Sequence, residues 1–119
     1  MKIKLAKKEI IHFIGIGGIG MSGLSLIMKG QGFKVQGSDI AFNKNIDRLK
    51  KEKIKIFLSH SKKNLKNATI VVISSAIKNN NPELTEAKRR KIPIIKRGKM
   101  LASIVSLMKN IVVVGSHGK

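Results

Sequence analysis

Two kinds of hydrophobic pattern alternate along the chain. Short apolar runs bounded by glycine or polar residues are typical of buried strands, and apolar residues that recur every three to four positions are typical of helices. The first pattern predicts strands at residues 9–14, 33–37, 54–58, 68–74, 92–96 and 110–115. The second predicts helices at residues 19–31, 43–53, 82–91 and 98–108. This alternation predicts an α/β fold, with a parallel sheet and helices on both of its faces.

The helix expected at 82–91 has a recognisable N-terminus in the preceding residues. Asn81 is able to accept hydrogen bonds from the first turn, and Pro82 suits the first helical position. Glu83 favours the positive end of the helix dipole. We therefore expect the helix to begin at Pro82 and to end near Lys91.

Composition restricts the classes of protein to which the chain can belong. Its 119 residues and 42% hydrophobic content suit one folded domain, and the lack of cysteine excludes disulfides and thiolate metal sites. Three histidines without metal-ligand spacing predict no metal site. The N-terminus lacks the features of a signal peptide, and glycines and polar residues within 10–28 argue against a membrane span. We expect a cytoplasmic protein.

The net charge of +19, from 25 Lys and Arg against 6 Asp and Glu, raises the hypothesis of nucleic-acid binding. The basic residues are mostly lysine and are scattered, and the chain has no Trp or Tyr for base stacking. No known nucleic-acid-binding motif is visible. We therefore expect no specific nucleic-acid binding, although the charge would attract a polyanionic small ligand.

A glycine-rich loop follows the first predicted strand, in the sequence HFIGIGGIGMSG. Gly15, Gly17 and Gly20 form the G-x-G-x-x-G pattern of dinucleotide-binding loops, and Gly18 adds a further glycine. The pattern permits a tight turn, close approach of backbone N–H groups to a pyrophosphate, and close packing of helix on strand. The helix N-terminus adds free N–H donors and partial positive charge, and Ser22 adds a hydroxyl.

Asp39 ends the second predicted strand, where dinucleotide-binding domains have a ribose-binding carboxylate about 20 residues beyond the last glycine. These residues alone leave NAD, FAD and a nucleotide sugar open as ligands. They also leave open a glycine-rich turn that binds nothing, with Asp39 as a solvated turn residue.

The chain ends in a second glycine-containing segment, GSHGK at 115–119, which follows the last predicted strand. A strand that runs into such a segment indicates the opening of a phosphate-binding loop. The first glycine of the full pattern is replaced by Val113, and the Ser or Thr that should follow Lys119 lies beyond the sequence. A plain turn after a strand is the alternative. We expect a chain that stops inside such a loop to be part of a longer protein.

Three segments of the chain together resemble the N-terminal domain of the Mur ligases. The resemblance spans nearly the whole chain after residue 8, and the joint occurrence of the segments is far more specific than the glycine pattern alone. The Met21–Ser22 pair is most similar to the alanine-adding branch of the family. The segments are IHFIGIGGIGMSG at 11–23, SSAIKNNNPEL at 74–84 with IPIIKRGKMLA at 92–102, and GSHGK at 115–119.

The resemblance implies a Rossmann-like domain over residues 1–108 that holds the UDP part of UDP-N-acetylmuramate, and not a nicotinamide. The diphosphate would lie in the glycine loop, and the uridine near the end of the second strand. For His60 an exposed histidine is the alternative, and for Arg97 a role in fixing the next helix. The implied substrate-binding residues are Gly15, Gly17, Gly18, Gly20, Met21, Ser22, Ser38, Asp39, His60, Ser74, Ser75, Ala76 and Arg97.

For residues 109–119 the resemblance implies the start of a central ATP-binding domain. The implied phosphate-binding residues are Gly115, Ser116, His117, Gly118 and Lys119. The family's chemistry is ATP-driven amide formation in peptidoglycan precursor synthesis, in which the muramate carboxylate becomes an acyl phosphate and the amine of L-alanine attacks it. Mg²⁺ neutralises phosphate charge in such transfers. The residues for these steps would lie mostly beyond Lys119, so we expect no catalytic residue, bound cofactor or ligase activity in this chain alone.

Two features of this chain lead to further expectations. The family usually has a glycine where Lys53 stands, and a left-handed backbone there would cost about 1–2 kcal/mol with lysine. The apolar strand expected at 110–115 would be able to pair with the edge of its own sheet or with a neighbouring molecule.

Two rival functions are retained from the sequence. An NAD(P)-binding domain of an oxidoreductase explains the glycine pattern and Asp39, but neither GSHGK nor SSAIKNNNPEL. A basic nucleic-acid-binding protein is favoured by charge alone.

Overall fold

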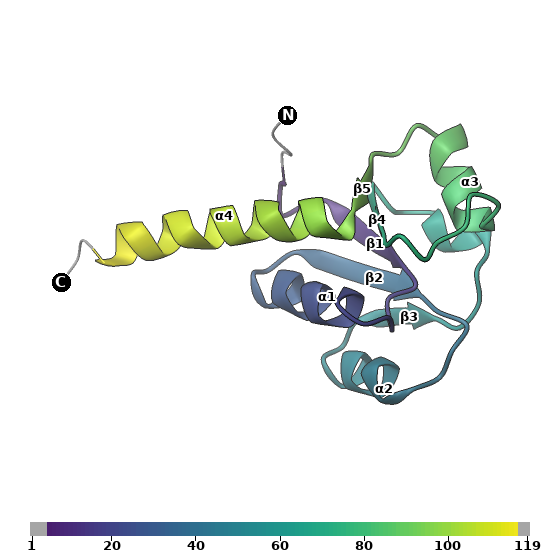
Figure 1. Cartoon of the computed structure of the whole chain (residues 1–119), viewed down its shortest axis with the longest axis horizontal. Helices are drawn as coiled ribbons and strands as arrows, with labels where there is room; N and C mark the ends of the chain where they lie inside the picture. Colours follow the sequence, from purple (N-terminus) through teal and green to yellow (C-terminus); the bar gives the residue numbers. More distant parts are fainter. Residues whose placement is uncertain (1–4, 117–119) are drawn as a thin grey trace.

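The computed structural model describes the backbone of residues 5–116 and the side chains of residues 5–109. A five-stranded parallel sheet, in the order β3-β2-β1-β4-β5, forms its centre. The chain winds outward from β1 to β3, returns across the sheet to β4, and ends the sheet at β5 (Figure 1). The strand order therefore reverses between β1 and β4. The strands are β1 (Ile10–Ile14), β2 (Lys34–Ser38), β3 (Lys55–Phe57), β4 (Ile70–Ile73) and β5 (Ile94–Lys96).

Helices cover both faces of the sheet, as the alternation of patterns predicts. Apolar side chains of α1, α2 and α4 pack into one core with the sheet, and those of α3 and η1 pack into a second core. The expected strands and helices between residues 9 and 96 are confirmed, and the 3-10 helix η1 is an addition. The helices are α1 (Met21–Gly30), α2 (Lys44–Lys51), η1 (Lys62–Leu65), α3 (Pro82–Arg89) and α4 (Arg97–Ser116).

The two faces of β1 differ in chemistry. Ile11 and Phe13 lie in the core beneath α1, and Ile14 lies in the core beneath α3. His12 is fully buried and directs its ring towards α3. Because side chains alternate along a strand, β1 places this one polar group next to an apolar core.

Three helices end in the same way, with a left-handed residue before the next strand. These residues are Gly32 after α1, Lys53 after α2 and Lys91 after α3, with φ values of 94°, 63° and 57°. The N–H groups of Lys53 and Ile54 donate to carbonyl groups in the last turn of α2, which is the Schellman arrangement. The backbone at Lys53 is therefore left-handed, which is the case in which lysine carries a cost relative to glycine.

The strand expected at 110–115 is wrong. Residues 110–116 continue α4, and the C-terminal half of this helix extends away from the sheet (Figure 1). Between Lys99 and Val114 the sequence contains no glycine or proline to end the helix. Helical hydrogen bonds are local, whereas a strand needs a neighbouring strand. The strand that was expected to mediate self-association is therefore not formed.

None of the helices in the described part of the chain combines the length and apolar character needed to cross a bilayer.

Candidate nucleotide-binding site

The predicted substrate-binding residues gather at one edge of the sheet. The glycine loop follows β1, Ser38 ends β2, His60 lies beyond β3, and Arg97 follows β5 directly. Ser74, Ser75 and Ala76 follow β4. This is the carboxyl edge of the sheet, and the loops after β1 and β4 flank the point at which strand order reverses. Parallel sheets bind ligands at such a point.

The glycine loop is anchored on the end of β2. The N–H groups of Gly15 and Ile16 both donate to the carbonyl oxygen of Ser38, at 2.8 and 3.0 Å. Gly15 and Gly20 have φ values of 77° and 81°, which only glycine adopts without strain. The loop therefore leaves β1 in a fixed direction and enters α1 at Gly20.

Asp39 holds the middle of the glycine loop. Its Oδ2 accepts a hydrogen bond from the Gly17 N–H at 2.8 Å, and its Oδ1 accepts one from the Ala41 N–H at 2.9 Å. The Asn45 side-chain amide donates to the Gly17 carbonyl oxygen at 3.0 Å. A Cβ atom on Gly17 would lie 2.8 Å from Ile46 Cδ1, so this position has no room for a side chain.

The tip of the loop presents free donors beside a cation. The N–H groups of Ile19 and Gly20 have no hydrogen-bond partner among the residues that the structure describes. They lie at the N-terminus of α1, where the helix dipole favours negative charge. A Cβ on Gly20 would lie 3.2 Å from Arg97 Cδ, and within residues 5–109 the Arg97 guanidinium has no acidic partner. Free N–H donors, the helix N-terminus and a guanidinium therefore lie together at the tip of the loop, and each of these groups favours negative charge.

Met21 and Ser22 contribute to the loop through their backbone. Both N–H groups donate to the Gly18 carbonyl oxygen at 3.1 Å, which closes the first turn of α1. The Met21 side chain is buried in the core, and Ser22 is also buried.

The turn after β4 lies across from the glycine loop, on the other side of the place where strand order reverses. The Ala76 N–H donates to the Ser74 hydroxyl at 3.3 Å, and Ser75 and Ala76 are exposed. A Cβ placed on Gly15 would lie 3.2 Å from Ile77 Cδ1, so the turn packs against the start of the glycine loop.

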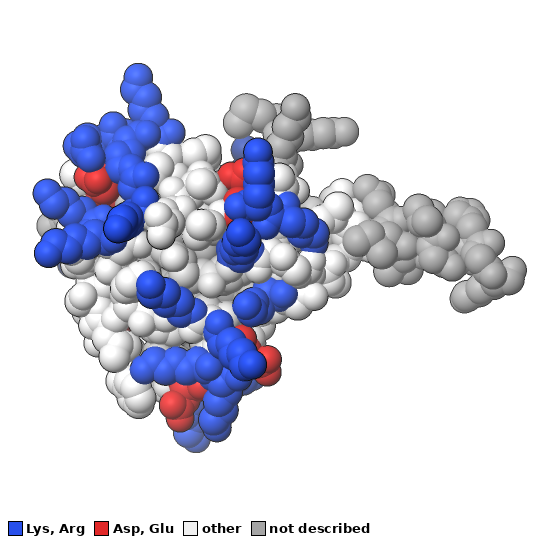
Figure 2. Space-filling view, turned by 180° about the vertical axis from the view of Figure 1, so that it is seen from behind, with Lys and Arg blue, Asp and Glu red and all other residues white. Residues whose placement is uncertain are grey.

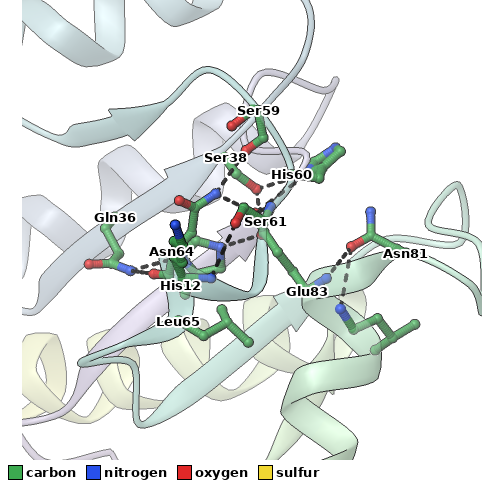
Figure 3. A network of polar contacts seen from close by, with 12 residues as sticks. His12, Gln36, Ser38, Ser59, His60, Ser61, Asn64, Leu65, Asn81 and Glu83 are labelled. Atoms are coloured by element: carbon green, nitrogen blue, oxygen red, sulfur yellow. Dashed lines mark hydrogen bonds and ion pairs between the residues drawn. The ribbon is translucent and has the colours of Figure 1, made fainter.

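A buried carboxylate, Glu83, lies next to the site (Figure 3). Its Oε1 accepts hydrogen bonds from His12 Nε2 at 2.7 Å and from the Ser38 hydroxyl at 2.6 Å. Its Oε2 accepts from the Ser61 N–H at 3.0 Å and from Asn64 Nδ2 at 2.7 Å. Glu83 thus connects α3 to β1, to β2 and to the segment that contains η1.

The contacts of Gln36 fix the protonation of His12 in this network. Gln36 Nε2 donates to the Asn64 carbonyl oxygen at 2.9 Å, so this end of the Gln36 amide is the nitrogen. The same nitrogen lies 2.8 Å from His12 Nδ1, which must therefore accept. His12 is then neutral and donates its Nε2 proton to Glu83, which is left as a buried carboxylate with donors on both oxygens.

Burial by itself raises the pKa of the Glu83 carboxyl group. Hydrogen bonds from His12, Ser38 and Asn64 favour the ionised form and act in the opposite direction. These contacts prevail, so the pKa of Glu83 lies below its ordinary value. Glu83 is ionised at neutral pH.

Comparison with known proteins assigns the chain to a family. The sequence profile described as "Mur ligase family, catalytic domain" matches residues 10–109. The chain belongs to the Mur ligase family. The resemblance to this family, seen in the sequence, is confirmed.

Relatives of this Mur ligase chain carry a more specific name. It is 76% identical over 119 residues to the UDP-N-acetylmuramate–L-alanine ligase of Pelagibacter ubique, covering all of this chain and 26% of that protein. It is 59% identical over 109 residues to the ligase of the same name in Rickettsia typhi, covering 92% of this chain and 22% of that protein. The chain thus spans about a quarter of the length of these curated relatives.

A solved structure shares the fold of this Mur ligase chain. The UDP-N-acetylmuramate-alanine ligase of Thermotoga maritima superimposes with a TM-score of 0.74 at 36% identity, over 85% of this chain and 23% of that protein. The expected α/β fold with a parallel sheet is confirmed.

The expected ATP-binding loop of the Mur ligase lies at the limit of the described structure. Gly115 and Ser116 form the end of α4, and their side chains are not described. His117, Gly118 and Lys119 lie outside the described residues. The phosphate-binding role of this segment stays a prediction.

Positive charge is spread over the face of the Mur ligase chain that Figure 2 shows. Figure 2 shows Lys and Arg side chains in separate groups, with uncharged surface between them and few acidic side chains. This distribution agrees with the scattered lysines of the sequence, and it differs from the single basic stripe typical of a nucleic-acid-binding face.

Sequence reasoning missed the polar network of the Mur ligase chain, although a signal was present. His12 interrupts the apolar run IIHFI, and Gln36 and Ser38 share one face of the next strand. His12 and Gln36 are partners in the register of β1 and β2. Glu83 was interpreted only as a residue that favours the start of α3. The sequence analysis did not recognise that Glu83 is the buried acceptor for the polar side chains of both strands.

Proposed function

We propose that this chain is the UDP-N-acetylmuramate-binding domain of a ligase that adds L-alanine to UDP-N-acetylmuramate. The observation that carries the proposal is the anion-binding position formed by the free N–H groups of Ile19 and Gly20 beside Arg97. It lies at the point where strand order reverses, in a chain 76% identical to a protein named for this reaction.

The diphosphate of the ligand binds at the tip of the glycine loop. The N–H groups of Gly15, Ile16 and Gly17 are already engaged with Ser38 and Asp39. The donors left for phosphate oxygens are those at the start of α1, and Arg97 supplies a neutralising guanidinium. Arg is well suited to phosphate because its N–H groups form a planar fork.

The uridine lies along the carboxyl ends of β2 and β3, beside Ser38, Asp39 and His60. The turn formed by Ser74, Ser75 and Ala76 borders the ligand on the β4 side. Both Asp39 oxygens accept hydrogen bonds from backbone N–H groups, so Asp39 also supports the loop. The relatives reported above are named for UDP-N-acetylmuramate and give no support to the NAD(P) alternative.

The ligase reaction requires the whole protein. We assign residues 1–108 to substrate binding and residues 109–119 to the start of the ATP-binding domain. ATP supplies the phosphoryl group that activates the muramate carboxylate, and L-alanine supplies the attacking amine. The described part of the chain has no group of three or more His, Cys, Asp and Glu residues able to hold a metal.

Titration calorimetry of this chain with UDP-N-acetylmuramate tests the proposal, with NADH as the control ligand. Measurements at about 0.15 M salt screen loose charge attraction beyond roughly 8 Å. We expect saturable binding of the UDP-sugar, no binding of NADH, and loss of binding on Gly17→Val. Tight binding of NADH, or equal heats from both ligands, would contradict the proposal.

A further inference from the structure

His60 is joined to the buried carboxylate through one hydroxyl group. The Ser38 hydroxyl lies 2.6 Å from Glu83 Oε1 and 3.1 Å from His60 Nδ1. The His60 Nδ1 also lies 3.7 Å from Glu83 Oε2. Ser38 and Glu83 are fully buried, whereas the His60 side chain is 19% exposed and projects outward from the network (Figure 3).

We propose that Glu83 is a positioning residue of the nucleotide site, and that it acts through Ser38 to fix which nitrogen of His60 faces the ligand. The proposal deepens the proposed function, because it takes the nucleotide as the ligand of the site.

The direction of the hydrogen bonds follows from the chemistry of the three groups. An ionised carboxylate only accepts, so the single hydroxyl proton of Ser38 points to Glu83. The Ser38 oxygen can then only accept towards His60. The neutral His60 ring must therefore carry its proton on Nδ1, and its Nε2 bears a lone pair.

The Nε2 atom of His60 has no hydrogen-bond partner among the described residues. As a bare acceptor, it recognises a group that can only donate, such as the ring N–H of a uracil base. The other tautomer would present a donor and would repel the same group. Glu83 thus determines whether His60 offers the ligand an acceptor or a donor, although Glu83 itself does not touch the ligand.

Glu83→Gln tests this direction of the hydrogen bonds. In Glu83→Gln an NH₂ group replaces one carboxylate oxygen. Both oxygens accept hydrogen bonds in the wild type, so the NH₂ group faces another donor in either orientation. If its nitrogen faces Ser38, the Ser38 proton turns towards His60 and the tautomer of His60 reverses. The matched control is Glu86→Gln, one turn further along α3, where the carboxylate pairs with Arg89 at the surface.

The direct readout is the His60 tautomer in the ligand-free chain, observed by long-range proton–nitrogen correlation NMR at neutral pH. We expect the proton on Nδ1 in the wild type and in Glu86→Gln, and a shift towards Nε2 in Glu83→Gln. Ser38→Ala removes the 3.1 Å acceptor directly, so the same shift is expected there if Glu83→Gln does not fold. An Nε2 proton in the wild type, or a tautomer unchanged in both folded variants, Glu83→Gln and Ser38→Ala, would overturn the proposal.

A double-mutant cycle measures the consequence for binding, with UDP as the probe. We expect Glu83→Gln to weaken UDP binding about tenfold, the scale of one lost hydrogen bond. In a His60→Ala background it should weaken binding less than about twofold, because its route to the ligand is gone. An equal effect in both backgrounds would overturn the proposal and leave the proposed function standing. No UDP binding by the wild type would count against the proposed function, while the ligand-free tautomer still decides the role of Glu83.

Discussion

The Oδ2 atom of Asp39 lies 2.8 Å from the backbone nitrogen of Gly17. This hydrogen bond joins the end of β2 to the glycine loop after β1, at the edge of the sheet where the site lies. It consumes one of the N–H groups that the glycine pattern would otherwise offer to a phosphate. The free donors of the loop are those of Ile19 and Gly20, at the start of α1, and the proposed anion-binding position consists of these donors and Arg97.

Asp39→Ala should destabilise the chain by about 1–2 kcal/mol, because two backbone N–H groups lose a charged acceptor. Urea unfolding of the wild type and the variant measures this difference. Asp47→Ala is the control, since Asp47 is an exposed residue in the first turn of α2 and should cost under about 1 kcal/mol. An unchanged midpoint for Asp39→Ala would show that the loop does not need this support.

Gly37→Ala should destabilise the chain by about 2–3 kcal/mol. The new Cβ would lie 2.6 Å from Ile16 Cβ and 2.8 Å from the Phe13 carbonyl oxygen, and backbone cannot move aside cheaply. Gly23→Ala is the matched control in α1, where a Cβ meets nothing within 4 Å. It should stabilise the chain by about 0.5–1 kcal/mol. Thermal unfolding of both variants should show opposite shifts in Tm.

Lys53→Gly and Lys91→Gly should each stabilise the chain by about 1 kcal/mol. Both lysines adopt the left-handed conformation after a helix, which glycine adopts without a steric cost. Lys50→Gly, within α2, should instead destabilise by up to about 1 kcal/mol. Chemical denaturation measures all three free energies of unfolding. Destabilisation by both of the first two substitutions would contradict the assigned helix ends.

Glu83 should make the stability of the chain depend on pH under acidic conditions. Its pKa in the folded chain lies below the ordinary glutamate value, so the unfolded chain binds the proton first as the pH falls. The stabilisation is therefore complete above roughly pH 4.3 and is lost as the pH falls through the folded pKa. Urea unfolding from pH 7 to pH 3 should show a difference between the wild type and Glu83→Gln that shrinks with acidity. A constant difference would contradict a buried carboxylate.

The succession of strands and helices along the chain could be predicted because each element between residues 9 and 96 carries its own local pattern. Asn81 and Pro82 mark the start of α3 through local chemistry, and the structure confirms the Asn81 cap. Residues 110–115 could not be predicted in this way. Their β-branched run favours a strand only if a neighbouring strand is present, and α4 continues through them instead.

The part of the candidate site that consists of backbone could be predicted from the sequence. The part that consists of buried side chains could not. The glycine spacing indicates the loop after β1 by itself. The contact of His12 with Glu83 joins residues 71 positions apart, and no local pattern encodes it. Asp39 shows the same limit, because its position predicted a ligand contact, and no local pattern indicated its hydrogen bond to Gly17.

The measurement that tests the account most directly is an NMR titration of the isotope-labelled chain with UDP-N-acetylmuramate at about 0.15 M salt. We predict saturable shifts that are largest at the Ile19 and Gly20 N–H groups and at the Arg97 guanidinium, and that are absent in Gly17→Val. Shifts confined to scattered surface lysines, or no shift in the loop at saturating ligand, would contradict the account.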